Sequence, residues 1–240
     1  MPLRFCRIGK FSLRPPLQRV IHSKTSMDLP SIIPVFPLPN VVLFPGVPLP
    51  LHIFEPRYRD MVRDASAGHE IIGMVLLRGD WRPRYHENPD IFETGCAGKL
   101  VNVEALPDGR RNILLHGHRE FIIRRQLFEK PYRQAEVAWR SMVHGGIDGG
   151  CRDRLINLLG RFLQAKPATP AHRLLHDRSL SDELLVNFFS YALDLAPLEK
   201  QGLLEAPSLT VRAERLREII EFHLEEARWG LKAPGPDRCH

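Results

Sequence analysis

The sequence has few cysteines, and no two of them lie near each other. The 240 residues include four, Cys6, Cys96, Cys151 and Cys239, with no C-x-x-C pair. A zinc ribbon needs closely spaced cysteine ligands, and a disulfide framework needs cysteines at compact, regular spacings. We therefore predict free thiols in a reducing compartment and a cytoplasmic location. We also predict no metal and no cofactor.

Long apolar runs and the motifs of nucleotide or acyl chemistry are also missing. No apolar run approaches the ~20 residues of a membrane helix, so we predict no membrane span. A phosphate-binding loop requires G-x-x-x-x-G-K-S/T, yet the two Gly-Lys pairs are followed by Phe11 and Leu100. No G-x-S-x-G nucleophile motif occurs. The sequence predicts that the chain is not an enzyme.

Two histidine pairs have spacings that metal sites use. His116 and His118 would share one face of a strand, and His172 and His176 lie one helical turn apart. The second pair stands in H-R-L-L-H, which lacks the glutamate that acts as general base in H-E-x-x-H. We interpret all four as solvated or hydrogen-bonded side chains.

Acidic residues are absent from the first 26 positions, which hold six basic ones. The whole chain has 34 basic and 28 acidic residues, so residues 27–240 are neutral overall. This balance argues against a nucleic-acid partner, because phosphate binding relies on an excess of Lys and Arg. Three interpretations of residues 1–30 stay open: a transit peptide leading to the mitochondrial matrix, a disordered basic tail, or a chain that starts at Met27.

Prolines, by contrast, are dense between Ile33 and Met61. Proline fixes φ and lacks a backbone donor, so this stretch can be neither one long helix nor a central strand. We predict two extended pieces, Ile32–Phe36 and Val47–Phe54, joined by a loop with Gly46 as its turn residue. A helix then begins at Glu55-Pro56, because proline suits the first helical position and an acid suits the helix dipole.

The next segments have the pattern of strands. Val101, Val103 and Ala105 are expected on one face of their strand, opposite Asn102 and Glu104. Pro107-Asp108-Gly109 is a hairpin turn signal. Short strands at close spacing favour an antiparallel barrel. The predicted strands are Ile71–Leu77, Gly95–Leu106, Asn112–His116, Arg119–Phe128 and Pro131–Trp139, with a polar loop at Arg78–Thr94.

After a glycine-rich linker at 144–150 the apolar spacing becomes helical. The predicted domain map is a leader at 1–30, a barrel at 31–143, the linker, a helical part at 151–229 and a tail at 230–240. Pro167 and Pro170 are expected to end the first helix, and Ser179 or Ser181 to cap the second. The later helices are predicted over Leu184–Ala192, over Pro197–Leu204, and from Pro207-Ser208 onward.

Two motifs carry a resemblance to a known family. The chain contains P-x-F-P-L-x-x-x-x-x-F-P-G, from Pro34 to Gly46, followed by I-F-E-P-R-Y from Ile53 to Tyr58. It resembles the Lon protease N-terminal, or substrate-binding, domain, over about residues 31–227. The resemblance implies an α+β fold with an N-terminal PUA-like antiparallel β-barrel and a C-terminal α-helical bundle. One departure is Cys96-Ala97-Gly98, where the family usually has a threonine and a bulkier residue.

Six polar and aromatic residues are the candidate substrate-binding set. A structural interpretation competes: Glu55 and Arg57 hold the start of the helix, Tyr58 packs inward, and the loop aromatics pack locally. Arginine and aromatic side chains are common interface anchors, which favours the binding interpretation for the loop. The candidates are His52, Glu55, Arg57, Tyr58, Trp81 and Tyr85.

The resemblance implies a non-catalytic module that binds unfolded or extended polypeptide, or a partner protein. The ATPase and peptidase domains of a full Lon protease do not follow in this sequence, so we expect a stand-alone binding domain linked to proteolysis. A groove between barrel and bundle, or an open barrel edge, is the expected place. The alternatives are a PUA-like RNA-binding protein and an undetected hydrolase.

Overall fold

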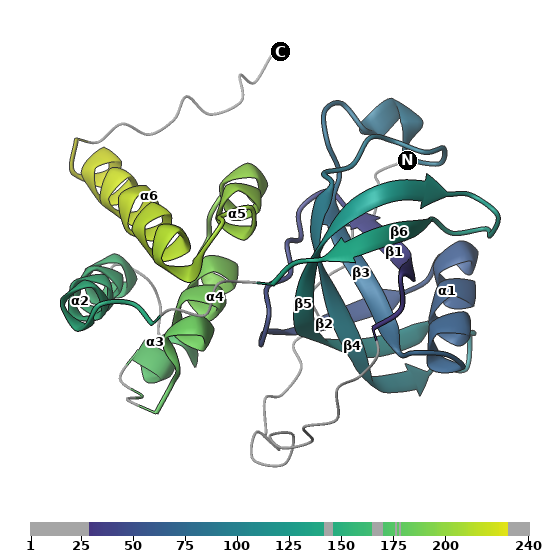
Figure 1. Cartoon of the computed structure of the whole chain (residues 1–240), viewed down its shortest axis with the longest axis horizontal. Coiled ribbons are helices and arrows are strands. Elements are labelled where there is room, and N and C mark those ends of the chain that lie inside the picture. Colours follow the sequence, from purple (N-terminus) through teal and green to yellow (C-terminus); the bar gives the residue numbers. More distant parts are fainter. Residues whose placement is uncertain (1–28, 142–145, 165–169, 176, 178, 230–240) are drawn as a thin grey trace. The chain divides into compact units, whose positions relative to one another are not determined.

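The computed structural model describes residues 29–141, 146–164, 170–175, 177 and 179–229. The chain divides into two compact units, a strand unit up to Arg140 and a helical unit from Ser141 (Figure 1). The predicted α+β class, with strands first and helices after, is confirmed. The predicted leader up to residue 28, the first two residues of the linker and the predicted tail lie outside the described residues. No helix in the described ranges is long and apolar enough to cross a membrane.

The strand unit is one mixed sheet that closes through a second pairing of β6. Its order is β2-β5-β4-β3-β1-β6, and β6 pairs again with β5, so five strands form a closed ring of pairings with β2 added to β5. The 17-residue β5 makes this closure possible, because its first half pairs with β2 and its second half with β6. The strands are β1 (Ile32–Leu38), β2 (Pro48–Ile53), β3 (Ile71–Leu76), β4 (Thr94–Ala105), β5 (Arg111–Leu127) and β6 (Gln134–Trp139).

The prediction of a purely antiparallel barrel is wrong at one pair. Strands β1 and β3 run parallel, with Val35 opposite Gly73 and Leu38 opposite Leu76. A parallel pair needs a long crossover connection. The 39–70 segment supplies it, because it holds β2 and helix α1 (Pro56–Ser66), which lies alongside the strands of its unit in Figure 1. The prolines in the sequence show where regular structure is interrupted in this segment. They do not show that the chain then pairs with β1 in the parallel direction.

The proline-rich loop between β1 and β2 is fastened to β5 at a glycine. Pro45 and Gly46 form the turn, with Gly46 at φ 78° and the Val47 amide donating to the Phe44 carbonyl at 3.2 Å, as predicted for the turn residue. The Gly46 amide then donates to the Gly117 carbonyl at 2.8 Å, and the Gly117 amide donates to the Val47 carbonyl at 2.9 Å. A Cβ atom at Gly117 would lie well inside contact distance of the Phe44 carbonyl oxygen. The loop can therefore sit here only because position 117 has no side chain.

A bulge in β4 overturns one predicted side-chain direction. Leu100 pairs with Leu115 but Asn102 pairs with Leu114, so Val101 is an extra residue in the ladder. Its side chain is 46% exposed, and not on the apolar face that alternation predicts. The hairpin turn that follows is as predicted, with Gly109 at φ 81°.

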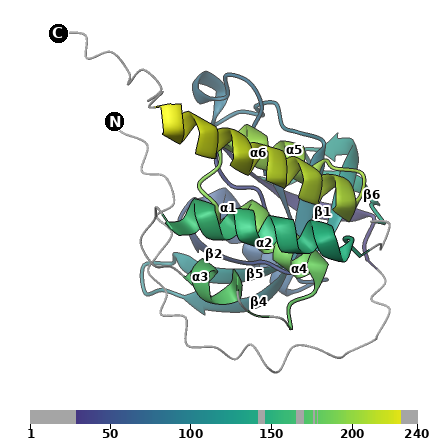
Figure 2. The ribbon, with the colours of Figure 1, turned by 90° about the vertical axis from the view of Figure 1, so that its left-hand side faces the viewer.

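The helical unit holds five helices among the described residues. Helices α2 and α6 pack against each other and lie side by side in Figure 2. Ser181 caps α4 by accepting a hydrogen bond from the Leu184 amide at 3.2 Å, as predicted. Pro170 begins a short helix that the sequence did not predict, and α2 starts within the predicted linker. The helices are α2 (Gly149–Gln164), α3 (Pro170–Leu175), α4 (Asp182–Ala192), α5 (Pro197–Leu204) and α6 (Leu209–Trp229).

A fully buried arginine joins three of these helices. Arg212 of α6 donates to the Leu203 and Leu204 carbonyls at the end of α5, at 2.8 and 3.1 Å. It also donates to the Asn187 side-chain oxygen of α4 at 2.6 Å. The last carbonyls of a helix have no partner within the helix, and burial makes an unsatisfied carbonyl costly. The Leu203 carbonyl also accepts from the Ala206 amide at 3.2 Å, and Arg212 adds buried hydrogen bonds to the end of α5.

Candidate functional site

The start of α1 brings four of the six candidate residues together. Glu55 is the N-cap residue, but its carboxylate makes no capping hydrogen bond. It accepts instead from Arg57 Nε at 3.0 Å and from the Tyr85 hydroxyl at 2.7 Å. The Arg57 guanidinium lies over the rings of Tyr58 and Tyr85, with 4.6 and 5.4 Å to the centroids. The polar loop between β3 and β4 is thus tied to the helix start.

Tyr58 is the buried member of this cluster and packs inward, as the structural interpretation of the sequence predicts. Its side chain packs against Phe36 of β1, with 4.2 Å between ring centroids. Burial raises the pKa of Tyr58 to about 12. Burial, and then the hydrogen bond to Glu55, raises the pKa of Tyr85 as well. Both phenols therefore stay neutral at physiological pH and can donate a hydrogen bond.

These residues form part of a pocket of about 250 Å³ in the strand unit. We call it the Arg57–Arg133 pocket. One wall carries Arg57, Tyr58 and Tyr85, together with residues 86–89 of the same loop. A second wall comes from the segment between β5 and β6, which the sequence analysis did not single out. That wall consists of Phe128, Lys130, Pro131, Tyr132 and Arg133.

Arg133 is more deeply buried than Arg57 and Lys130, the other Arg and Lys residues of the pocket lining. It is only 6% exposed, and its Nη2 donates to the Pro89 carbonyl at 2.9 Å. Its Nη1 is buried and has no hydrogen-bond acceptor among the described residues. Burial, with a further contribution from the charge of Arg57, lowers the pKa of Arg133. The ring of Phe128, which is 53% exposed, lies 5.8 Å from the guanidinium.

The second wall is anchored to α1 through Asp64. Its carboxylate accepts from Lys130 Nζ and from the Tyr132 hydroxyl, both at 2.8 Å. These two hydrogen bonds lower the pKa of Asp64 to about 2. The charge of Lys130 is therefore balanced by the Asp64 carboxylate. The same carboxylate, which lies outside the pocket lining, fixes the Tyr132 hydroxyl.

We expect the anchor at Asp64 to stabilise the fold at neutral pH and to fail in acid. A carboxyl group whose pKa falls on folding contributes stability above its ordinary pKa, and that contribution is lost as pH falls from about 4 to 2. Asp64→Asn should cost about 0.5–1 kcal/mol at pH 7, the scale of surface ion pairs. Urea titrations at several pH values should show that the difference in free energy of unfolding between variant and wild type shrinks toward pH 2. A difference that stays constant over this range would contradict the role given to the charge.

The other two candidates lie outside the lining of this pocket. His52 of β2 is bonded through Nδ1 to the Asn112 side-chain oxygen at 2.8 Å. Trp81 is partly buried against the core of the strand unit and meets Tyr85 edge to face at 5.9 Å. The structure thus places the His52 ring in a cross-strand contact and gives Trp81 a packing role beside the pocket.

Within the described ranges, no three metal-ligating side chains gather. His116 and His118 lie on the surface of β5, with their rings partly covered. Burial of the rings lowers the pKa of each, which favours neutral imidazoles. His172 bonds through Nε2 to the Leu163 carbonyl at 3.1 Å, while His176 lies outside the described residues.

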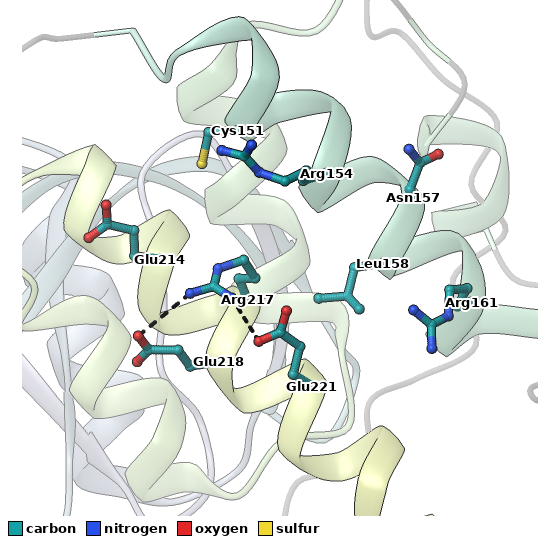
Figure 3. Close-up of a pocket in the computed structure, with 9 residues that line it drawn as sticks. All are labelled: Cys151, Arg154, Asn157, Leu158, Arg161, Glu214, Arg217, Glu218 and Glu221. Carbon is teal, nitrogen blue, oxygen red and sulfur yellow. Dashed lines mark hydrogen bonds and ion pairs between the residues drawn. The ribbon is translucent and has the colours of Figure 1, made fainter.

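The helical unit has a hollow of its own, of about 530 Å³, between α2 and α6 (Figure 3). Its lining is mostly charged, with Arg154 and Arg161 from α2 facing acidic residues of α6. Arg217 pairs with Glu221 at 2.7 Å and with Glu218 at 3.8 Å, so these charges of α6 are satisfied within the helix. None of the sequence-predicted site residues lies in this hollow.

The fold resembles that of two solved Lon N-terminal domains. The crystal structure of a Lon N-terminal domain protein from Xanthomonas campestris matches with a TM-score of 0.58 at 24% identity, covering 77% of this chain and 96% of the other. The N-terminal domain of the Mycobacterium avium complex Lon protease matches with a TM-score of 0.64 at 18% identity, over 80% and 99%. At these identities the likeness shows a shared fold.

Sequence comparison identifies the family. The chain belongs to the ATP-dependent protease La (LON) substrate-binding domain family, whose model matches residues 32–221. The Lon protease of Flavobacterium johnsoniae is 31% identical over 206 residues, and that of Cytophaga hutchinsonii is 28% identical over 206 residues. These matches cover 83% and 82% of this chain but 25% of each relative. The chain thus spans about a quarter of the length of the curated relatives it matches.

Proposed function

We propose that this chain binds extended or unfolded polypeptide without cleaving it, and that the Arg57–Arg133 pocket receives part of the bound segment. Membership of the Lon substrate-binding domain family supports the ligand class. The absence of phosphate-loop and nucleophile motifs from the sequence supports binding without catalysis. The observation that carries the location is the pocket itself, where two arginines and three tyrosines converge.

The chemistry of the pocket suits a peptide. Tyrosine and arginine are over-represented among interface anchors, because each combines a large contact area with a polar group that needs a partner. Phe128 adds an exposed aromatic ring at the pocket, and the Arg133 guanidinium lies beside that ring. A segment that placed an apolar side chain on Phe128 would bury surface that now faces water.

An open strand edge is a poorer binding place in this fold. Among the described strands, β2 pairs with β5 alone, so its other edge is open. Two of its six residues, Pro48 and Pro50, are prolines and cannot donate backbone hydrogen bonds. A strand that lacks donors is a weak template for an added strand. The structure therefore favours side-chain recognition at the pocket over strand addition at β2.

Phe128→Ala should weaken polypeptide binding about 5- to 10-fold, because truncating an interface anchor costs more than ~1 kcal/mol. The probe is fluorescently labelled α-lactalbumin, reduced and carboxamidomethylated so that it stays unfolded. Fluorescence anisotropy with the full chain gives the affinity, and gel electrophoresis after incubation should show the probe uncut.

The matched control is Phe222→Ala. Phe222 lies on α6 and is 59% exposed, close to the 53% of Phe128, so both variants remove a similar exposed ring. The control should leave the affinity unchanged. If the wild-type chain binds no unfolded probe, the proposed function fails; if both variants lose affinity equally, the location fails.

A further inference from the structure

The charges around the Arg57–Arg133 pocket are unevenly balanced. Arg57 is paired with Glu55 at 3.0 Å, and Lys130 is paired with Asp64 at 2.8 Å. Glu87, the acid of the lining, is within ion-pair distance of Arg84 at 3.2 Å. Arg133 has no carboxylate within ion-pair distance among the described residues. The charge of Asp90 acts on Arg133 from beyond ion-pair distance, so the pocket holds one guanidinium that makes no direct ion pair among the described residues.

Burial makes the missing hydrogen bond of the Arg133 guanidinium costly. A charged group removed from water loses hydration that only hydrogen bonds or an opposite charge can replace. For Arg133 the replacement is partial, because Nη2 has the Pro89 carbonyl and Nη1 has nothing among the described residues. An anion bound at this point would gain a charge-assisted hydrogen bond and remove the penalty already present in the free protein.

We infer that the Arg57–Arg133 pocket selects a carboxylate on the bound polypeptide, either an acidic side chain or the C-terminal carboxylate, with Arg133 as its partner. This inference rests on the proposed function. A carboxylate can accept a charge-assisted hydrogen bond from Nη1, and a neutral amide of the same shape cannot do so with equal strength. The neighbouring aromatic rings provide room for the apolar part of the same segment.

Access to Nη1 requires a side chain to move. The atom is covered in the free protein, so a carboxylate reaches it only after the cover shifts. Phe128 is the neighbour with freedom to shift, because its ring is half exposed and lies over the guanidinium. The same ring that receives the apolar part of the ligand would then open the way to the cation.

Three acetylated ten-residue peptides of alanine, phenylalanine and one central variable residue test the selection. The first has a central glutamate and an amidated C-terminus, the second a central glutamine and a free C-terminus, and the third a central glutamine and an amidated C-terminus. Either or both of the first two should bind the wild-type chain about 10-fold more tightly than the third, the gain of one charge-assisted hydrogen bond. The tighter binder identifies the source of the carboxylate.

Arg133→Gln locates the effect. Glutamine keeps a polar side chain but removes the charge, so the preference for a carboxylate should fall to below 2-fold. Arg119→Gln, an exposed arginine on β5 outside the pocket lining, makes the same change in net charge and should keep the preference. Circular dichroism and thermal melts establish that each variant is folded.

The outcomes separate the two proposals. Equal binding of all three peptides to the wild-type chain overturns the carboxylate inference and leaves polypeptide binding standing. Binding of none of them, together with no binding of unfolded α-lactalbumin, overturns both. Tighter, Arg133-dependent binding of a ten-nucleotide single-stranded RNA than of any peptide also overturns the inference, because the anion would then be a phosphate. The wild-type comparison needs no variant, so it decides the matter even if Arg133→Gln does not fold.

Discussion

Gly117→Ala is expected to lower the free energy of unfolding of the strand unit by about 3 kcal/mol or more, the upper range for overpacking a filled site. The new methyl group would collide with the Phe44 carbonyl, which belongs to backbone and cannot rotate away. Relief would require the proline-rich loop to lift off β5. That movement would break the two hydrogen bonds between Gly117 and the loop residues Gly46 and Val47.

Urea or thermal unfolding followed by circular dichroism measures this loss, with Gly202→Ala as the control. Gly202 lies in α5, and nothing stands within 4 Å of the position that its Cβ would take. Alanine there should stabilise by about 0.5–1 kcal/mol, because glycine costs backbone entropy in a helix. If Gly117→Ala changes stability by less than 1 kcal/mol, the loop is not held as the structure shows.

Arg212→Met is expected to destabilise the helical unit by about 3 kcal/mol. Methionine fills much of the volume of the arginine stem but leaves the Leu203 and Leu204 carbonyls and the Asn187 amide oxygen without this donor. The Leu203 carbonyl keeps its hydrogen bond from the Ala206 amide at 3.2 Å, but each lost hydrogen bond from a charged donor costs about 1.5–3 kcal/mol. Removal of the desolvated charge offsets part of that cost.

Arg215→Met is the matched control for this substitution. Arg215 lies on the same helix, and its Nη1 donates to the Gly202 carbonyl of α5 at 2.8 Å, but this contact is exposed. Water can replace an exposed donor, so Arg215→Met should lower the free energy of unfolding by no more than about 0.5 kcal/mol. Chemical unfolding of both variants measures the difference. Equal losses would mean that burial of the Arg212 hydrogen bonds contributes little to the stability of the unit.

The sequence predicted those parts of the fold that depend on local backbone chemistry. Pro56 at the helix start, Gly46 and Gly109 in their turns, and Ser181 as a cap each act through neighbours in the chain. Pairing partners are different, because they depend on where distant segments meet. The parallel β1–β3 pair and the bulge at Val101 leave no local pattern, so the predicted antiparallel order and side-chain direction were wrong there.

In the candidate site, too, the sequence revealed residues that stand in conspicuous local segments and missed a residue whose role depends on distant contacts. Glu55, Arg57 and Tyr58 were found because they stand in one conspicuous segment, and Tyr85 because aromatics are unusual in a polar loop. Arg133 was missed because it stands where a strand was expected, and only the folded chain shows that it is buried without a carboxylate. The cytoplasmic location and the character of the leader stay predictions, since residues 1–28 lie outside the described part.

The closed ring of strand pairings has a consequence for synthesis of the chain. Strand β1 emerges from the ribosome early, yet Ile32 pairs with Glu136, about a hundred residues later. At elongation rates of about 5–20 residues per second, β1 waits on the order of 5–20 s for its last neighbour. During that interval β3 can cover one edge of β1, while the other edge stays free to meet foreign strands. Pro37 lies on the same edge of β1 as Val35, whose amide donates to the Arg133 carbonyl, so its missing backbone donor reduces the risk of aggregation at the free edge until β6 arrives.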